Sequence, residues 1–234
     1  EWQSAGKAFE RAAEVESLGG EPDGGCRQLI QAAGCYKRVQ PEQAIALLER
    51  ACGLLVRQGR FSSAAAHEKE IGELWEGLGD LKQAIKAFEG AAERYAGEDS
   101  AVTAQTLWLK VAALACDTGD LERAVEIWER TARDSAGDAI RRYSVRDHLL
   151  RAGLARLCLG DLVGAKRALE EQYLAWDPSL LGTREGKLLL DLTDCMLEAD
   201  AELFKQRVAE FERVAGLDEV KTRLLARCLR AIGE

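Results

Sequence analysis

Several residue types that would point to particular structures are scarce or missing in this chain of 234 residues. It has only three prolines and 6% aromatic residues, and it has no asparagine. Proline interrupts helices, whereas the abundant Ala, Leu, Glu, Arg and Lys are strong helix formers, so the composition predicts a helix-rich protein. With 47% hydrophobic and 31% charged residues, the chain is expected to be soluble and globular, and long enough for one large core or a stacked array.

Long apolar runs and clustered cysteines are missing too. The longest apolar stretches, such as residues 111–116, are far shorter than the roughly 20 residues of a membrane span. The seven cysteines include no CxxC pair, so neither a structural zinc site nor a thioredoxin-type pair is predicted. Free cysteines within apolar patterns, and the lack of a secretory signal after Glu1, predict a reducing, cytoplasmic location.

Sequence motifs for catalysis and for nucleic-acid binding are likewise missing. The chain contains no GxxxxGK[ST], GxGxxG, GxSxG or HExxH, and its two histidines, His67 and His148, have no cysteine or paired carboxylate at ligand spacing. No enzymatic activity, cofactor, metal ion or small-molecule substrate is therefore predicted. The net charge of -8 and the lack of aromatics between the basic residues argue against a nucleic-acid partner.

An internal repeat is the strongest positive signal. An alanine followed four residues later by a large apolar residue recurs at intervals of 39 to 41 residues, the period of helical repeats. A small residue lets two helix backbones approach, and the large residue one turn later fills the space beside that contact. The five copies are Ala5/Phe9, Ala44/Leu48, Ala84/Phe88, Ala124/Trp128 and Ala165/Leu169.

The turn between helices repeats as well. Gly-Asp-Leu stands at residues 79–81, 119–121 and 160–162, where glycine ends one helix in a left-handed conformation and aspartate caps the next. The pattern predicts an all-α fold: a right-handed superhelical array of TPR-like (tetratricopeptide-like) helical hairpins that form a twisted sheet over residues 1–178. A C-terminal helical bundle is expected over residues 179–234, with helices near 185–198, 201–214 and 217–232.

The chain resembles a known family over nearly its whole length. In order along the sequence, the matching segments are YKR at 36–38, PEQAI at 41–45, GRF at 59–61, YAGEDS at 95–100, LKVA at 109–112, RYSVRD at 142–147 and TREGKL at 183–188. Several local matches in the same order are specific, whereas single TPR-like features are not. By these segments the chain is similar to the soluble NSF attachment proteins (SNAPs), in particular the alpha type.

This resemblance implies a non-enzymatic adaptor in vesicle trafficking and membrane fusion. Such a protein binds the acidic SNARE four-helix bundle, which contains a syntaxin-like chain, through a basic concave face. It recruits the hexameric AAA+ ATPase NSF, which separates the bundle, and it associates with membranes peripherally through its partners. The family also has a membrane-touching hairpin before the position of Glu1 and an acidic tail after that of Glu234, so direct membrane contact is expected only for a chain that carries them.

Basic residues are unevenly distributed in a way that suits an acidic partner. Residues 141–156 hold five arginines and one aspartate, whereas residues 117–138 hold seven acids and three arginines. On a helix, Arg146 and Arg156 lie about 40° on either side of Arg142, so the three share one face. The three are candidate SNARE contacts, and the resemblance favours Arg142 and Arg146 among them. Thr106 lies one repeat before Arg146, and Lys110, one helical turn after Thr106, is a fourth candidate that extends the patch.

Two alternatives stay open at this point. The arginines of residues 142–156 can form a solvated stripe or pair within the chain with the neighbouring acidic helix. Three weaker candidates, Arg60, Arg184 and Lys187, match the family segments but can equally anchor turns or cap helices.

The chain as a whole can also be a generic TPR-like scaffold for a peptide or helical partner outside the SNARE system, although such a groove typically presents asparagines, and the sequence has none.

Overall fold

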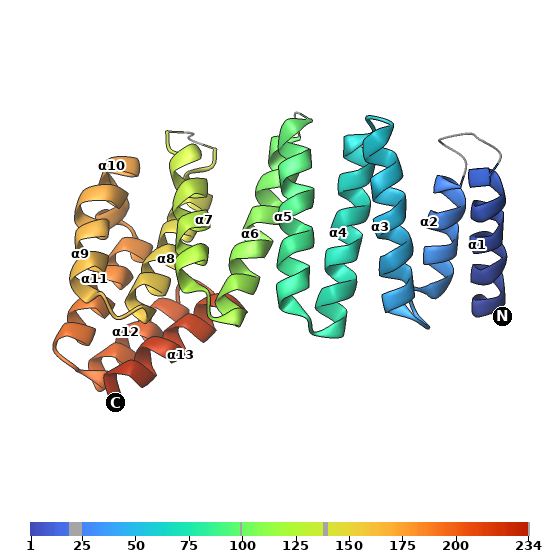
Figure 1. The fold of residues 1–234 in the computed structure, drawn as a ribbon. Helices are drawn as coiled ribbons and strands as arrows, with labels where there is room; N and C mark the ends of the chain where they lie inside the picture. The colour runs from blue at the N-terminus through green and yellow to red at the C-terminus, as the bar shows by residue number, and fades with distance from the viewer. Residues whose placement is uncertain (19–24, 99, 138–139, 234) are drawn as a thin grey trace. The chain divides into compact units, whose positions relative to one another are not determined.

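The computed structural model describes residues 1–18, 25–98, 100–137 and 140–233. Throughout these residues the regular structure is helical (Figure 1), which confirms the predicted all-α array of helical hairpins. Internal contacts separate the chain into two compact units, Glu1–Val111 and Ala112–Glu234. The expected division after residue 178 falls inside the second unit, because the C-terminal helices pack on α8.

The first unit is a row of antiparallel helices. From α1 to α5 the helices pack in sequence order, α1 on α2, α2 on α3, α3 on α4 and α4 on α5, and consecutive helices run in alternate directions (Figure 1). The helix that follows them, α6, leads from the first unit into the second. The helices are α1 (Trp2–Leu18), α2 (Cys26–Tyr36), α3 (Pro41–Arg57), α4 (Phe61–Leu78), α5 (Leu81–Gly97) and α6 (Ala101–Thr118).

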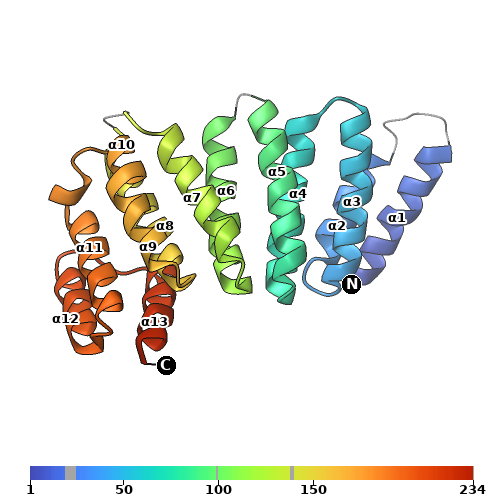
Figure 2. The ribbon, with the colours of Figure 1, turned by 60° about the vertical axis from the view of Figure 1, so that its left-hand side comes forward.

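The second unit is arranged around α8, which packs against α7, α9, α11 and α13 (Figure 2). The predicted C-terminal helices are confirmed, with ends within two residues of those expected. The elements are α7 (Leu121–Asp134), α8 (Arg142–Cys158), α9 (Leu162–Arg167), the π-helical η1 (Ala168–Tyr173), α10 (Leu174–Trp176), the 3-10 turn η2 (Leu180–Gly182), α11 (Arg184–Leu197), α12 (Ala201–Glu212) and α13 (Glu219–Gly233).

The repeated Gly-Asp-Leu turns have the predicted geometry. Gly79, Gly119 and Gly160 have φ angles of 83°, 86° and 84°, which are left-handed values that favour glycine. The aspartate that follows each one caps the next helix, since its side chain accepts a hydrogen bond from the backbone N–H three residues later. The same residue types thus end one helix and begin the next at three successive hairpins.

The repeated pairs of an alanine and a large apolar residue lie in the core in four of the five copies. Ala44, Ala84 and Ala124 are fully buried, as are their large partners, and Ala165 and Leu169 are nearly so. In the first copy Ala5 is only partly covered, and Phe9 is 36% exposed. The reason is position, because α1 is the first helix of its row and packs against α2. The repeat therefore predicts the core correctly only where a helix has neighbours on both sides.

Five of the seven cysteines and most of the longest apolar run also lie in the core. All seven cysteines are free thiols, and only Cys35 and Cys158 are partly exposed. In the run from Val111 to Cys116, every residue except Ala113 is buried in helix α6. None of the described helices combines the length and the hydropathy required to cross a lipid bilayer.

A close backbone contact at the start of α11 makes Gly186 a sensitive position. A Cβ added there would lie 2.2 Å from the Leu180 carbonyl oxygen, so the backbone of η2 would have to move. Gly186→Ala is expected to lower the free energy of unfolding by about 2 kcal/mol, as measured by urea denaturation. Gly53→Ala, in the open middle of α3, is the control and should raise it by about 0.5 kcal/mol. Equal effects of the two substitutions would contradict the close contact.

Candidate partner-binding surface

The predicted arginines lie on α8 at two separate places. Arg142 is the first residue of this helix, and the structure describes its backbone but not its side chain. Arg146 follows one turn later, whereas Arg156 lies near the other end, about 15 Å farther along the helix axis. The structure therefore keeps Arg142 and Arg146 together on the first turns of α8 and places Arg156 apart from them.

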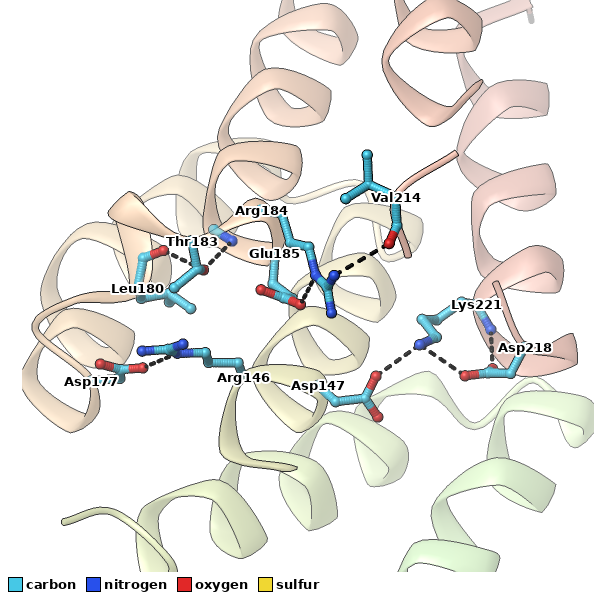
Figure 3. Close-up of polar contacts among 11 residues, drawn as sticks. Arg146, Asp147, Asp177, Leu180, Thr183, Arg184, Glu185, Val214, Asp218 and Lys221 are labelled. Carbon is cyan, nitrogen blue, oxygen red and sulfur yellow. Dashed lines mark hydrogen bonds and ion pairs between the residues drawn. The ribbon is translucent and has the colours of Figure 1, made fainter. Parts of the chain in front are cut away.

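Arg146 is held in place by the segment that follows α10. Its Nε donates to Asp177 Oδ2 at 2.8 Å (Figure 3). Its Nη2 donates to Ser179 Oγ at 2.8 Å. Burial by itself would raise the pKa of the Asp177 carboxyl, but hydrogen bonds from Ser179 and Arg146 outweigh it and lower that pKa. The Arg146 side chain is only 15% exposed. Its guanidinium is therefore a fixed group with little freedom left to lose on binding.

Two exposed side chains that the sequence analysis did not single out belong to this region: Tyr143, beside Arg146, and Ile140, just before α8. The Arg146 guanidinium carbon lies 5.8 Å from the centre of the Tyr143 ring, a cation–π distance. Tyr143 is 76% exposed, and Ile140, just before α8, is 91% exposed. Exposed aromatic and apolar side chains beside an arginine are typical of protein interfaces. The sequence signal that could have identified them is their position next to the arginines at the start of α8.

Arg184, one of the weaker candidates, belongs to the same region. It begins α11, where its Nε pairs with Glu185 at 2.8 Å and its Nη1 donates to the Val214 carbonyl at 3.3 Å (Figure 3). The ion pair with Glu185 raises the pKa of Arg184, and the nearby Tyr143 adds to the shift. We name Ile140, Tyr143, Arg146 and Arg184 together the Tyr143 surface. Arg184 also anchors the turn after α12, one of the roles that the sequence left open.

Arg156 lies in a different environment, between α8, α7 and η1. Its Nε and Nη2 donate to the two carboxylate oxygens of Glu129, at 2.6 and 2.9 Å. The buried Tyr173 hydroxyl donates to the same carboxylate at 2.7 Å. This paired arrangement, which raises the pKa of Arg156 through the Glu129 hydrogen bonds, is the intramolecular ion pair that the sequence left open. Tyr173 is the last residue of the π-helical segment η1.

The remaining candidates lie elsewhere. Lys110 belongs to the first unit, where its Nζ pairs with Glu76 Oε1 at 2.5 Å while 42% of its side chain stays exposed. Arg60 is the exposed residue just before α4 and lines a cavity of about 420 Å³ together with Arg27 and His67. Lys187 is exposed on α11.

A charged cluster on the other side of α8 was not predicted. Lys221 of α13 places its Nζ 2.7 Å from Asp147 and 3.0 Å from Asp218 (Figure 3), and Arg151 pairs with the same two carboxylates. Burial by itself would lower the pKa of Lys221, but the hydrogen bonds to Asp147 and Asp218 raise it. The cluster fixes α13 against the helix that carries Arg146. Because Asp147 and Lys221 are 74 residues apart, no local pattern reveals this contact.

Comparison with known proteins identifies relatives over almost the whole chain. The profile of the family described as "Soluble NSF attachment protein, SNAP" matches residues 1–233. The chain is 36% identical over 231 residues to the alpha-soluble NSF attachment protein of Vitis vinifera, covering 99% of this chain and 80% of the relative. It is 35% identical to a probable vesicular-fusion protein sec17 homolog of Schizosaccharomyces pombe, with the same coverage. The human alpha-soluble NSF attachment protein is 30% identical over 99% of this chain and 78% of its own length.

Proposed function

Because the chain belongs to the soluble NSF attachment protein family, we propose that it is an adaptor that brings the NSF ATPase to assembled SNARE bundles. In this role the chain binds the bundle and NSF, and NSF separates the bundle with energy from ATP hydrolysis. The adaptor itself is not an enzyme and uses no cofactor. The observation that carries the proposal is the family match over residues 1–233, which leaves no large part of the chain for an unrelated activity.

The location follows from the same proposal. SNARE bundles are anchored in membranes, and the chain is proposed to work in the cytoplasm and to reach membranes through its partners. Several relatives carry names that refer to vesicular fusion, consistent with a role in vesicle transport. The generic-scaffold alternative is not favoured, because TPR-like scaffolds in general do not share the sequence of one family over a whole chain.

We propose the Tyr143 surface, together with Arg142, as a contact for the acidic SNARE bundle. Three properties support it: a fixed guanidinium at Arg146, an exposed aromatic ring beside it, and a second arginine at Arg184. Rigid aromatic and arginine side chains contribute strongly to interfaces because they lose little conformational entropy on binding. Lys110 is proposed as a separate basic contact on the first unit. Arg156 is proposed to act through Glu129, by holding α8 against α7 and η1.

A binding experiment at two salt concentrations tests the proposal. The chain is expected to bind an assembled SNARE bundle at about 50 mM salt and to bind roughly tenfold more weakly at about 500 mM, because contacts between exposed charges are screened. Immobilised bundle, with the bound chain quantified after washing, provides the measurement. Adding NSF and ATP to the loaded bundle should then release the SNARE chains.

The control for this experiment is a single, unassembled SNARE chain, which lacks the four-helix surface. If the chain does not bind the bundle at low salt, or if it binds the bundle no better than the unassembled SNARE chain, the proposed function is contradicted and the generic scaffold is favoured. Binding that does not change with salt would contradict the charged contact at the Tyr143 surface but not the family role.

A further inference from the structure

Two thiols from distant parts of the chain meet between α8 and α13. Cys158, in the last turn of α8, and Cys228 of α13 have their sulfur atoms 3.2 Å apart. Each thiol also lies near a backbone carbonyl of the other helix: Cys158 Sγ is 3.3 Å from the Leu224 oxygen, and Cys228 Sγ is 3.7 Å from the Leu154 oxygen. A disulfide needs sulfur atoms about 2.0 Å apart, so the pair is about 1 Å from bonding distance between helices that already pack together.

The surroundings make the two thiols unequal. Cys158 is partly exposed, whereas Cys228 is fully buried. The hydrogen bond between the two thiols lowers the pKa of Cys158, and the nearby Arg227 charge lowers it further, whereas the same hydrogen bond and burial raise the pKa of Cys228. Since the thiolate is the reactive form and Cys158 is the more exposed of the two thiols, Cys158 is the candidate nucleophile and Cys228 the candidate resolving thiol. Among the described residues, no group of three or more His, Cys, Asp or Glu side chains lies close enough together to hold a metal ion.

We propose that Cys158 and Cys228 form a reversible disulfide when the protein meets hydrogen peroxide. The Cys158 thiolate attacks one peroxide oxygen and the O–O bond breaks, giving a Cys158 sulfenic acid and hydroxide, which takes up a proton to become water. Cys228 then attacks the Cys158 sulfur as the S–O bond breaks. The oxygen leaves as a second water with the Cys228 proton, so two thiols lose two electrons and one peroxide is reduced to two waters.

The bond would attach the last helix to the centre of its unit. The first turn of α13 is already held to α8 by Lys221 and Asp147, and the disulfide adds a covalent link more than one turn farther along α13. It also closes a long loop of the chain, which reduces the conformational entropy of the unfolded state. The oxidised protein should therefore keep α13 docked under conditions that release it in the reduced protein.

Hydrogen peroxide treatment of the wild-type chain tests this inference. We expect two fewer free thiols than the seven of the reduced chain, and a peptide that joins Cys158 to Cys228 in a non-reducing digest analysed by mass spectrometry. The melting temperature should rise by roughly 5–10 °C, from the loop-closure entropy of a long loop. Dithiothreitol should reverse all three changes.

Two variants supply the controls. Cys195→Ser removes a buried thiol of α11 outside this contact and should still form the link. Cys228→Ser should give a Cys158 sulfenic acid that dimedone labels, and no link. If Cys228→Ser fails to fold, the digest of the wild-type chain still decides. A link from Cys158 to another cysteine, seven unchanged thiols, or a link that lowers the melting temperature would each overturn the proposal.

Discussion

Arg146→Glu is expected to weaken binding to an assembled SNARE bundle by about 30-fold or more, because it reverses a charge of the Tyr143 surface that Asp177 and Ser179 hold in place. A loss of this size corresponds to about 2 kcal/mol, the lower end for a charged pair at an interface. Fluorescence titration of the bundle with the chain at low salt measures the change. Arg207→Glu is a matched control, since Arg207 also pairs with a carboxylate in the second unit, and it should change the affinity less than threefold.

The structure makes this substitution less simple than the sequence suggests. Arg146 is the partner of the buried Asp177, so Arg146→Glu places two carboxylates together and loosens the segment at residues 177–179. A loss of binding by itself therefore does not distinguish a direct contact from local disorder. Asp177→Asn separates the two, because it removes the charge that Arg146 neutralises but keeps the guanidinium.

The two explanations give opposite results for Asp177→Asn. If the Arg146 guanidinium contacts the bundle, the variant should bind within about threefold of the wild-type chain. If Arg146 only holds the segment at residues 177–179, Asp177→Asn should weaken binding about as much as Arg146→Glu. Tyr143→Ala adds an independent check, since it removes an exposed ring without breaking an ion pair, and should weaken binding about tenfold. Unchanged binding of both Arg146→Glu and Tyr143→Ala would sink the assignment of this surface.

Arg156→Ala is expected to lower the free energy of unfolding by about 3 kcal/mol. The substitution leaves the Glu129 carboxylate, whose side chain is only 14% exposed, with Tyr173 as its remaining hydrogen-bond donor. A carboxylate that loses its cation in a partly buried site keeps its desolvation cost and loses its compensation. Urea denaturation followed by circular dichroism measures the change. Lys205→Ala breaks an exposed pair with Glu202 and should cost less than about 0.5 kcal/mol.

A second substitution tests the reason for that loss. In Arg156→Ala combined with Glu129→Gln, the uncompensated charge is gone, so much of the stability should return. Stability that stays as low as in Arg156→Ala would mean that the packing of the arginine stem, and not the carboxylate, explains the loss. The double variant also tests the role of Arg156 in binding. We expect it to bind SNARE bundles about as well as the wild-type chain if Arg156 acts through Glu129.

The features that could be predicted from the sequence are those set within one or two helical turns. The Gly-Asp-Leu turns follow from the left-handed freedom of glycine and the cap of the next residue, both local properties. The buried alanine stripe follows from the period of a helix. These signals, with the ordered family segments, were enough for the all-α array and the family. They were not enough for Phe9, because its exposure depends on which helices surround α1.

The tertiary structure alone decided which charges and thiols meet. Arg146 and Arg156 share a helix face in the sequence pattern, yet one pairs with Asp177 and the other with Glu129, which are 31 and 27 residues away. Cys158 and Cys228 are 70 residues apart and lie in contact. The physical reason is that an ion pair or a thiol contact depends on distances of a few ångströms between separate helices. The sequence by itself determined the helices, their turns and the family, and the packing of the segments around α8 determined which side chains are paired inside the chain and which stay exposed.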